Sequence, residues 1–194
     1  MYTQSGDFMN VKELYELLSC NPVIAAFGQD GWDEAIASPC EILFCLKSKL
    51  STIKTEVEKA HTCQKLVFVH IDLAEGIGKD REGLEFLKQI GVDGIISTKN
   101  QLIRFAKELS LFTVQRFFAL DSTGLDSVNE MLHSVSPDMI EIMPGVLGKV
   151  IKRFANGSLP VIAGGLIETK TEVTEALSNG AAAVSTGKRE LWYI

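Results

Sequence analysis

The stretch Val161-Ile162-Ala163-Gly164-Gly165-Leu166-Ile167, near the end of the chain, is decisive for the fold. Its apolar, β-rich run ends in two glycines, which let a backbone approach an anion closely and turn with positive φ. A second run, Ala183-Val184-Ser185-Thr186-Gly187-Lys188, ends in two hydroxyl side chains and a glycine. Barrels of eight βα units commonly bind phosphate after strands seven and eight. The place of these two runs in the strand order therefore decides between a closed (β/α)8 barrel and an open doubly wound sheet.

Short apolar runs alternate with amphipathic segments along the whole chain, as expected for βα units around a parallel sheet. We expect strands at residues 22–27, 41–46, 66–73, 94–97, 113–120, 139–143, 160–163 and 182–186. We expect helices at residues 10–18, 32–37, 50–61, 81–90, 101–109, 125–135, 146–154 and 170–178. The two glycine-bearing runs are thus the seventh and eighth strands.

Periodicity alone does not separate an open doubly wound sheet from a closed barrel. A dinucleotide fold places its glycine-rich turn after the first strand, where Phe27-Gly28-Gln29-Asp30-Gly31 does not match the G-x-G-x-x-G spacing. The sequence therefore predicts an α/β protein of the (β/α)8 TIM-type barrel class, with a single compact domain over residues 1–194. Residues 1–9 are expected to form a flexible N-terminal segment.

The composition is that of an ordinary globular protein, with 46% hydrophobic residues, 23% charged residues and a net charge of −6. No apolar run reaches the roughly 18 residues of a membrane-spanning helix, and the first residues lack the features of a signal peptide. We expect a cytoplasmic protein with no membrane partner. Because RNA affinity comes largely from Lys and Arg on phosphates, RNA binding by this acidic chain would need a local patch. The basic clusters at residues 47–49, 104–107 and 149–153 fit solvated helix faces best, with RNA contact by some of them as the alternative.

The first candidate site is a phosphate cup, which we define as Gly164, Gly165, Ser185, Thr186 and Gly187. Backbone amides, hydroxyls and the start of a short helix would converge there on one anion. Either half alone is equally well explained as a tight βα turn or a helix start. The two halves together, after strands seven and eight, favour a phosphate ligand.

Polar residues at the end of the third strand form a second candidate group. His70 and Asp72 have the same strand parity, so both can point into the barrel mouth. Asp72 is the preferred contact for a ligand hydroxyl. His70 fits equally well as a ligand contact and as a core histidine.

Glu141 is a third candidate, because it lies between apolar residues on a strand expected to be buried. A buried carboxylate needs partners, so Glu141 is either a ligand group or one half of an internal ion pair. The candidates for the other half are Lys47, Lys99 and Arg116. We expect no metal, because the carboxylates show no clustered ligand spacing.

From the residues alone, catalysis stays open. The phosphate cup with Asp72, Glu141, His70 and Lys99 would suit an isomerase, epimerase or aldolase that acts on a small phosphorylated substrate. No pair among these residues has a diagnostic spacing, and a fold does not dictate function. The residues therefore predict a barrel that binds a phosphorylated ligand.

Several strand-end segments resemble the glycerol-3-phosphate-responsive antiterminator family, the bacterial regulators of glycerol-utilisation operons. They are residues 22–26 (PVIAA), 69–73 (VHIDL), 91–99 (GVDGIISTK), 115–122 (QRFFALDS), 141–145 (EIMPG), 163–167 (AGGLI) and 185–192 (STGKRELW). Each segment alone is a weak signal. Together they extend over nearly the whole chain, which makes the resemblance specific.

The resemblance implies a regulator and not an enzyme, with glycerol 3-phosphate as its effector and no cofactor. With glycerol 3-phosphate bound, the regulator would act on the leader of a nascent mRNA to prevent premature termination of transcription. The phosphate cup would hold the phosphate, Asp72 and Glu141 would accept hydrogen bonds from the glycerol hydroxyls, and Lys99 and Arg116 would balance charge. The sequence does not assign the RNA-contacting residues. A homo-oligomer that juxtaposes basic helix faces is one way for an acidic chain to bind RNA.

Overall fold

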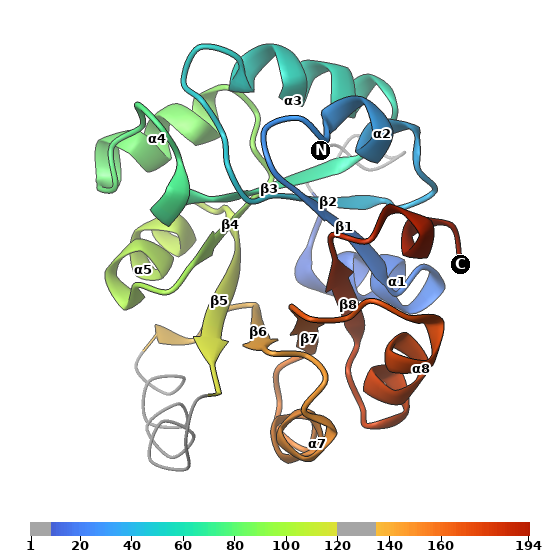
Figure 1. Cartoon of the computed structure of the whole chain (residues 1–194). Coiled ribbons are helices and arrows are strands. Elements are labelled where there is room, and N and C mark those ends of the chain that lie inside the picture. Colours follow the sequence, from blue (N-terminus) through green and yellow to red (C-terminus); the bar gives the residue numbers. More distant parts are fainter. Residues whose placement is uncertain (1–8, 120–134) are drawn as a thin grey trace.

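The eight expected strands close into a parallel barrel in the order β1 to β8, in which β8 pairs back onto β1. The structure is a computed structural model that describes residues 9–119 and 135–194. In Figure 1 the strands lie at the centre and the helices are arranged around them. The closed order confirms the predicted (β/α)8 barrel and excludes an open doubly wound sheet.

The observed elements agree closely with the predicted ones. The strands are β1 Val23–Phe27, β2 Ile42–Cys45, β3 Leu66–His70, β4 Gly94–Ser97, β5 Phe112–Phe118, β6 Met139–Met143, β7 Val161–Gly164 and β8 Ala183–Thr186. The described helices are α1 Val11–Cys20, α2 Trp32–Ala37, α3 Ile53–Thr62, α4 Arg81–Gln89, α5 Asn100–Glu108, α7 Gly148–Ala155 and α8 Lys170–Ser178. Two 3-10 turns are η1 Ile71–Leu73 and η2 Arg189–Tyr193. The helix expected at 125–135 lies outside the described residues except for Val135, and so does the N-terminal segment except for Met9.

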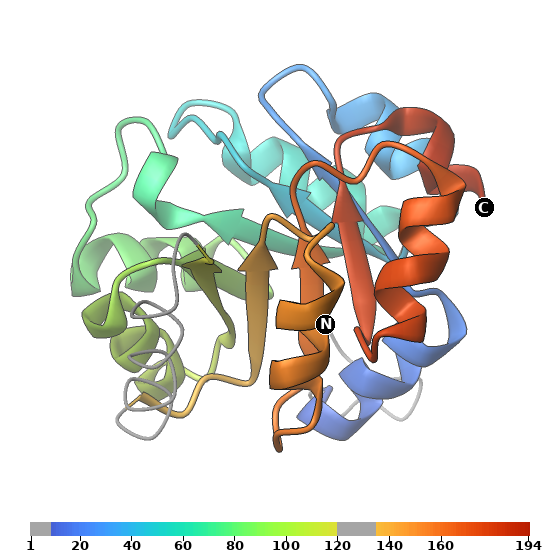
Figure 2. The ribbon, with the colours of Figure 1, turned by 60° about the horizontal axis from the view of Figure 1, so that its bottom comes forward.

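Alternation along the strands sorts side chains between the barrel interior and the helices. Ile24, Phe44, Phe68 and Ile162 belong to the interior cluster, and residues of the opposite parity pack against the helices. Because the side-chain period of a strand is two, the polar residues further along the same strands also face the barrel axis. Those residues lie at the carboxyl ends of the strands, which we call the barrel mouth. In Figure 2 the arrows of the orange and red strands point upward to this end.

Helix α1 closes the opposite end of the barrel. A capping box formed by Asn10 and Glu13 begins the helix. Leu14 and Leu18, one turn apart, are fully buried among the interior residues of the strands. The interior is thus sealed at the amino ends of the strands, and the polar side chains that face the axis gather at the mouth.

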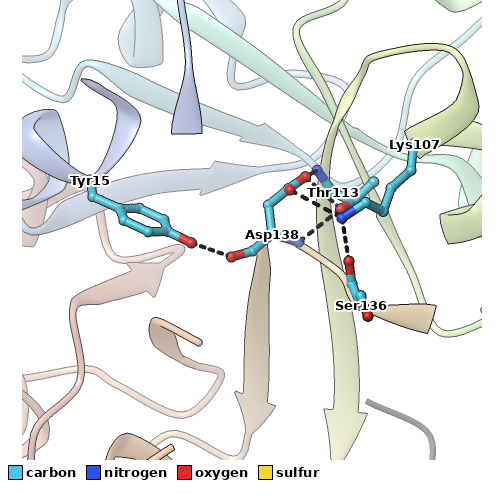
Figure 3. A network of polar contacts seen from close by, with 5 residues as sticks. All are labelled: Tyr15, Lys107, Thr113, Ser136 and Asp138. Atoms are coloured by element: carbon cyan, nitrogen blue, oxygen red, sulfur yellow. Dashed lines mark hydrogen bonds and ion pairs between the residues drawn. The ribbon is translucent and has the colours of Figure 1, made fainter. Parts of the chain in front are cut away.

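A polar network holds α1 against the start of β6 (Figure 3). The Tyr15 hydroxyl donates to the backbone carbonyl of Asp138 at 2.5 Å, and the Asp138 carboxylate accepts from Thr113 N–H and Oγ1 at 2.9 and 2.7 Å. Burial and the nearby Asp138 charge raise the pKa of Tyr15 to about 12. Tyr15 is therefore an uncharged donor that links α1 to β5 and β6.

The third strand is shorter than predicted. It ends at His70, and Asp72 lies in η1 instead of on an extended strand reaching residue 73. The reason is tertiary: the Asp72 carboxylate accepts hydrogen bonds from residues at the end of β4. The parity argument therefore holds for His70 and fails for Asp72.

Candidate functional site

An ion pair between β5 and β6 lies at the centre of the polar side chains of the mouth. Arg116 and Glu141 are partners in the strand register, and the Arg116 Nε lies 2.6 Å from Glu141 Oε2. Both side chains are buried, at 7% and 1% exposure. Of the three cations considered from the sequence, Arg116 is the partner, whereas Lys47 and Lys99 are exposed.

Ser185 extends this pair toward the phosphate cup. Its hydroxyl donates to Glu141 Oε1 at 2.5 Å, so both carboxylate oxygens of Glu141 have a donor. Ser185 lies beside Gly164 in the β7–β8 register. A Cβ on Gly164 would collide with Glu141 Oε1 and lie 2.7 Å from Ser185 Oγ. Glycine at position 164 is thus what allows the carboxylate and the hydroxyl to meet.

The chain turns sharply at the first half of the phosphate cup. Gly165 has φ +75° and Leu166 has φ +58°, and the Leu166 side chain is 67% exposed. A left-handed leucine is strained, and such residues cluster at functional sites. Within the described part of the chain, the backbone N–H groups of Gly165 and Leu166 make no hydrogen bond. The turn therefore offers donors to an anion at the mouth.

Thr186 joins the two halves of the phosphate cup. Its hydroxyl donates to the Ile167 carbonyl at 2.7 Å and accepts from the Lys188 N–H at 3.1 Å. Thr186 is buried and of the parity that faces away from the axis, so it positions the loops instead of pointing into the mouth. The position next to it is open, because a Cβ on Gly187 would meet only Ala26 O, at 3.5 Å.

Asp72 is fully engaged by the end of β4. Its Oδ1 accepts from Ser97 Oγ at 2.7 Å, and its Oδ2 accepts from Thr98 N–H and Oγ1, both at 2.8 Å. Partial burial alone would raise the pKa of Asp72, but the hydrogen bonds from Thr98 and Ser97 outweigh it and hold the pKa below the usual range. Asp72 thus fastens η1 to β4 as a charged acceptor.

His70 is a buried side chain of the parity that faces the barrel axis. It is 4% exposed, and neither Nδ1 nor Nε2 has a partner among the described residues. Burial lowers the pKa of His70, and the Arg116 charge lowers it further, against smaller opposite effects of Asp72 and Glu141. The ring is therefore a neutral imidazole close to the Arg116–Glu141 pair.

The loops after β7 and β8 lie side by side, as strand order predicted, but several hydrogen-bond partners at the mouth were not among the predicted residues. Ser97 and Thr98 anchor Asp72, and Gly145 donates its N–H to the Gly164 carbonyl at 2.6 Å. The adjacent Ser-Thr after the fourth strand was the available signal, since hydroxyl residues at strand ends often bind neighbouring loops. Nothing local in the sequence pointed to Gly145.

Comparison with known proteins identifies the family. The model of the family described as "Glycerol-3-phosphate responsive antiterminator" matches residues 23–192. The chain belongs to this family. Within the curated proteins, the chain is 35% identical over 185 residues to "Uncharacterized protein YgcP" of Escherichia coli K12, covering 92% of this chain and 95% of that protein.

Two solved structures agree with this assignment. The glycerol uptake operon antiterminator regulatory protein of Listeria monocytogenes is 32% identical, with a TM-score of 0.83 over 89% of this chain and 95% of that one. A glycerol uptake operon antiterminator-related protein of Thermotoga maritima is 35% identical, with a TM-score of 0.79 over 88% and 96%. The resemblance seen in the strand-end segments is thereby confirmed.

More distant structures share only the fold. An N-acetylmannosamine-6-phosphate 2-epimerase from Clostridium perfringens has a TM-score of 0.70 at 12% identity.

Across residues 9–119 and 135–194, no group of three or more His, Cys, Asp or Glu side chains is arranged to hold a metal. No helix in these two ranges is long and apolar enough to cross a bilayer.

Proposed function

We propose that this antiterminator-family protein senses glycerol 3-phosphate in the barrel mouth and, with the effector bound, binds the leader mRNA of a glycerol-utilisation operon. The family match over residues 23–192 is the observation that carries the proposal. The site geometry supports it, because the loops after β7 and β8 offer amide donors next to a polar, charge-balanced interior.

The phosphate would lie at the phosphate cup. Gly165 and Leu166 supply backbone N–H donors from a left-handed turn, and Gly187 leaves the approach open. Ser185 adds a hydroxyl, and Thr186 holds the two loops in register. Amides and hydroxyls that converge in this way bind anions without a metal.

The glycerol part would face the polar interior of the mouth. Arg116 and Glu141 neutralise each other there, which suits an uncharged portion of a ligand. Lys99, exposed beside the end of β4 with its N–H held by Ser97 Oγ at 3.0 Å, would balance the phosphate charge from the rim. Asp72 would contribute indirectly, because its hydrogen bond from the Thr98 N–H fixes the loop after β4.

Regulation requires that the effector bind the RNA-competent state more tightly than the other state. The two halves of the phosphate cup come from different loops joined by the Thr186 hydroxyl. A phosphate that contacts both loops would favour the conformation in which they are together. We propose that this ordering is what the RNA, or a second copy of the chain, responds to.

The test combines effector binding with RNA binding. Isothermal titration calorimetry should show saturable binding of glycerol 3-phosphate, and filter binding should show that the effector increases affinity for the operon's leader transcript. That affinity should fall steeply with salt, as it does when cations neutralise phosphates. An overnight NMR assay should show the effector unchanged. No RNA binding at low salt with effector present would refute the antiterminator role, and conversion of the effector would favour the isomerase, epimerase or aldolase alternative.

A further inference from the structure

His70 differs from the other polar residues that face the barrel axis at the mouth. Arg116, Glu141 and Ser185 are bonded to one another, whereas both ring nitrogens of His70 lack a partner within the described residues. Buried polar atoms are almost always hydrogen-bonded in native proteins, so an exception calls for an explanation. Only 4% of His70 is exposed, so its unpaired ring nitrogens lie beneath the surface and not on the rim of the mouth.

The two carboxylates whose charges act on His70, Asp72 and Glu141, already accept hydrogen bonds. Asp72 accepts three hydrogen bonds from Ser97 and Thr98. Glu141 accepts from Arg116 through one oxygen and from Ser185 through the other. These carboxylates stabilise their own donors, and neither is bonded to the imidazole. Among the described residues neither carboxylate is left to bond the imidazole, so a bound ligand is the candidate partner of His70.

The site also limits the chemistry of that partner. A neutral imidazole offers one N–H donor and one nitrogen acceptor. A hydroxyl group, which donates and accepts, complements both functions, whereas a phosphate or carboxylate oxygen only accepts. The cation whose charge acts on His70, Arg116, is already paired with Glu141 at 2.6 Å. An anionic group beside His70 would find no free positive charge there, so a neutral hydroxyl is favoured.

His70 borders the same part of the mouth as the phosphate cup. By strand alternation His70 faces the barrel axis, as Arg116 and Glu141 do, and Glu141 accepts a hydrogen bond from Ser185 of the cup at 2.5 Å. A small ligand with an anionic end in the cup would therefore direct its hydroxylated end toward the interior that His70 faces.

We propose that His70 is the specificity-determining residue of this site, which recognises a hydroxyl of a phosphorylated polyol whose phosphate lies in the phosphate cup. This inference rests on the proposed function, because it assumes a phosphate in the cup. It assigns hydroxyl recognition to His70, where the sequence favoured Asp72 and Glu141. The site then selects a phosphorylated alcohol over an alkyl phosphate of the same length.

The experiment compares two probes on two proteins. Calorimetry measures glycerol 3-phosphate and n-propyl phosphate, which has the same phosphate and carbon chain but no hydroxyls, on the wild type and on His70→Leu. The wild type should bind glycerol 3-phosphate about 10-fold more tightly than propyl phosphate, the ratio expected of about one net hydrogen bond in a buried site. His70→Leu should reduce that ratio to near one and leave propyl phosphate affinity unchanged. His70→Gln, which keeps a donor and an acceptor, should restore part of the ratio.

The outcomes separate this inference from the proposed function. Equal wild-type affinity for both probes, or a ratio that survives His70→Leu, would overturn the role of His70 while leaving a phosphate sensor in place. A wild type that binds neither probe would refute the effector site itself. If His70→Leu does not fold, the ring nitrogens are followed by ¹⁵N NMR in the wild type. Glycerol 3-phosphate should then shift their resonances more than propyl phosphate does, and equal shifts would overturn the inference.

Discussion

Arg116 and Glu141 face each other across the β5–β6 register and form a buried ion pair, with Nε and Oε2 2.6 Å apart. Two charges that are both more than nine-tenths buried are favourable only while they stay together. The pair also ties β5 and β6 to β8, because Ser185 donates to the second oxygen of Glu141. It is therefore the structural centre of the mouth as well as a neighbour of the proposed ligand.

Arg116→Leu should destabilise the protein by about 3–5 kcal/mol, because Glu141 would be left buried without its cation. Urea unfolding followed by circular dichroism measures this change. The double variant Arg116→Leu/Glu141→Leu should be more stable than Arg116→Leu alone, since no charge then remains buried. A double variant that is less stable than the single variant would contradict this explanation.

Gly164→Ala should destabilise the protein by about 1–3 kcal/mol, the usual cost of overpacking. The added methyl would overlap Glu141 Oε1 and Ser185 Oγ. Gly187→Ala is the matched control, because its methyl would meet only a carbonyl oxygen at 3.5 Å. The control should keep wild-type stability in thermal unfolding, and it should weaken glycerol 3-phosphate binding if the phosphate approaches there. Equal stability of the two alanine variants would show that Gly164 is not under this constraint.

The stability of the wild type should fall as the pH drops below about 6.5, in part because of His70. Since the pKa of His70 is lowered in the folded protein, the unfolded chain takes up this proton at a higher pH. The contribution of neutral His70 is complete above pH 6.5 and is lost at lower pH, by at most about 1.4 kcal/mol per pH unit.

Urea unfolding at pH 7.5, 6.5 and 5.5 tests this pH dependence. His70→Gln should show a shallower decline than the wild type between pH 6.5 and 5.5, because glutamine does not titrate. The other histidines are the same in both proteins, so the difference between the two curves reports on position 70. Parallel curves would mean that His70 takes up its proton equally in both states.

Tyr15→Phe should lower stability by about 1 kcal/mol, since it removes the hydrogen bond from α1 to the Asp138 carbonyl. For a protein of this size the melting temperature should fall by roughly 2–4 °C. Tyr193→Phe is the control, because Tyr193 is 61% exposed, and it should melt like the wild type. A Tyr15→Phe variant that also melts like the wild type would show that apolar packing of α1 suffices.

The sequence predicted the barrel because its signals are local and repeated. Apolar strand runs, amphipathic helices and the glycine pair at Gly164 and Gly165 each reflect the backbone conformation of their own segment. Errors appeared where a distant partner ended an element. β3 stops at His70, because Asp72 bonds to Ser97 of β4 and to Thr98 directly after it, and the chain turns into η1 there.

The candidate site was predicted in part. Placing the Gly164 and Ser185 loops side by side followed from strand order, and the structure pairs them in register. The sequence also required a cation for the buried Glu141, but it left three candidates. Only the β5–β6 register, which places Arg116 opposite Glu141, decides among them.

The sequence by itself thus determined the eight-stranded barrel, its strand order, the family resemblance and the loops that meet at the mouth. Each of these follows from the pattern of residues within short segments of the chain. The tertiary structure alone decided which polar groups are already bonded. Asp72 accepts hydrogen bonds from the end of β4 and Glu141 from β5 and β8, whereas the ring nitrogens of His70 have no partner in residues 9–119 and 135–194. Hydrogen-bond partners are set by contacts between residues far apart in the chain, and a linear pattern does not record them.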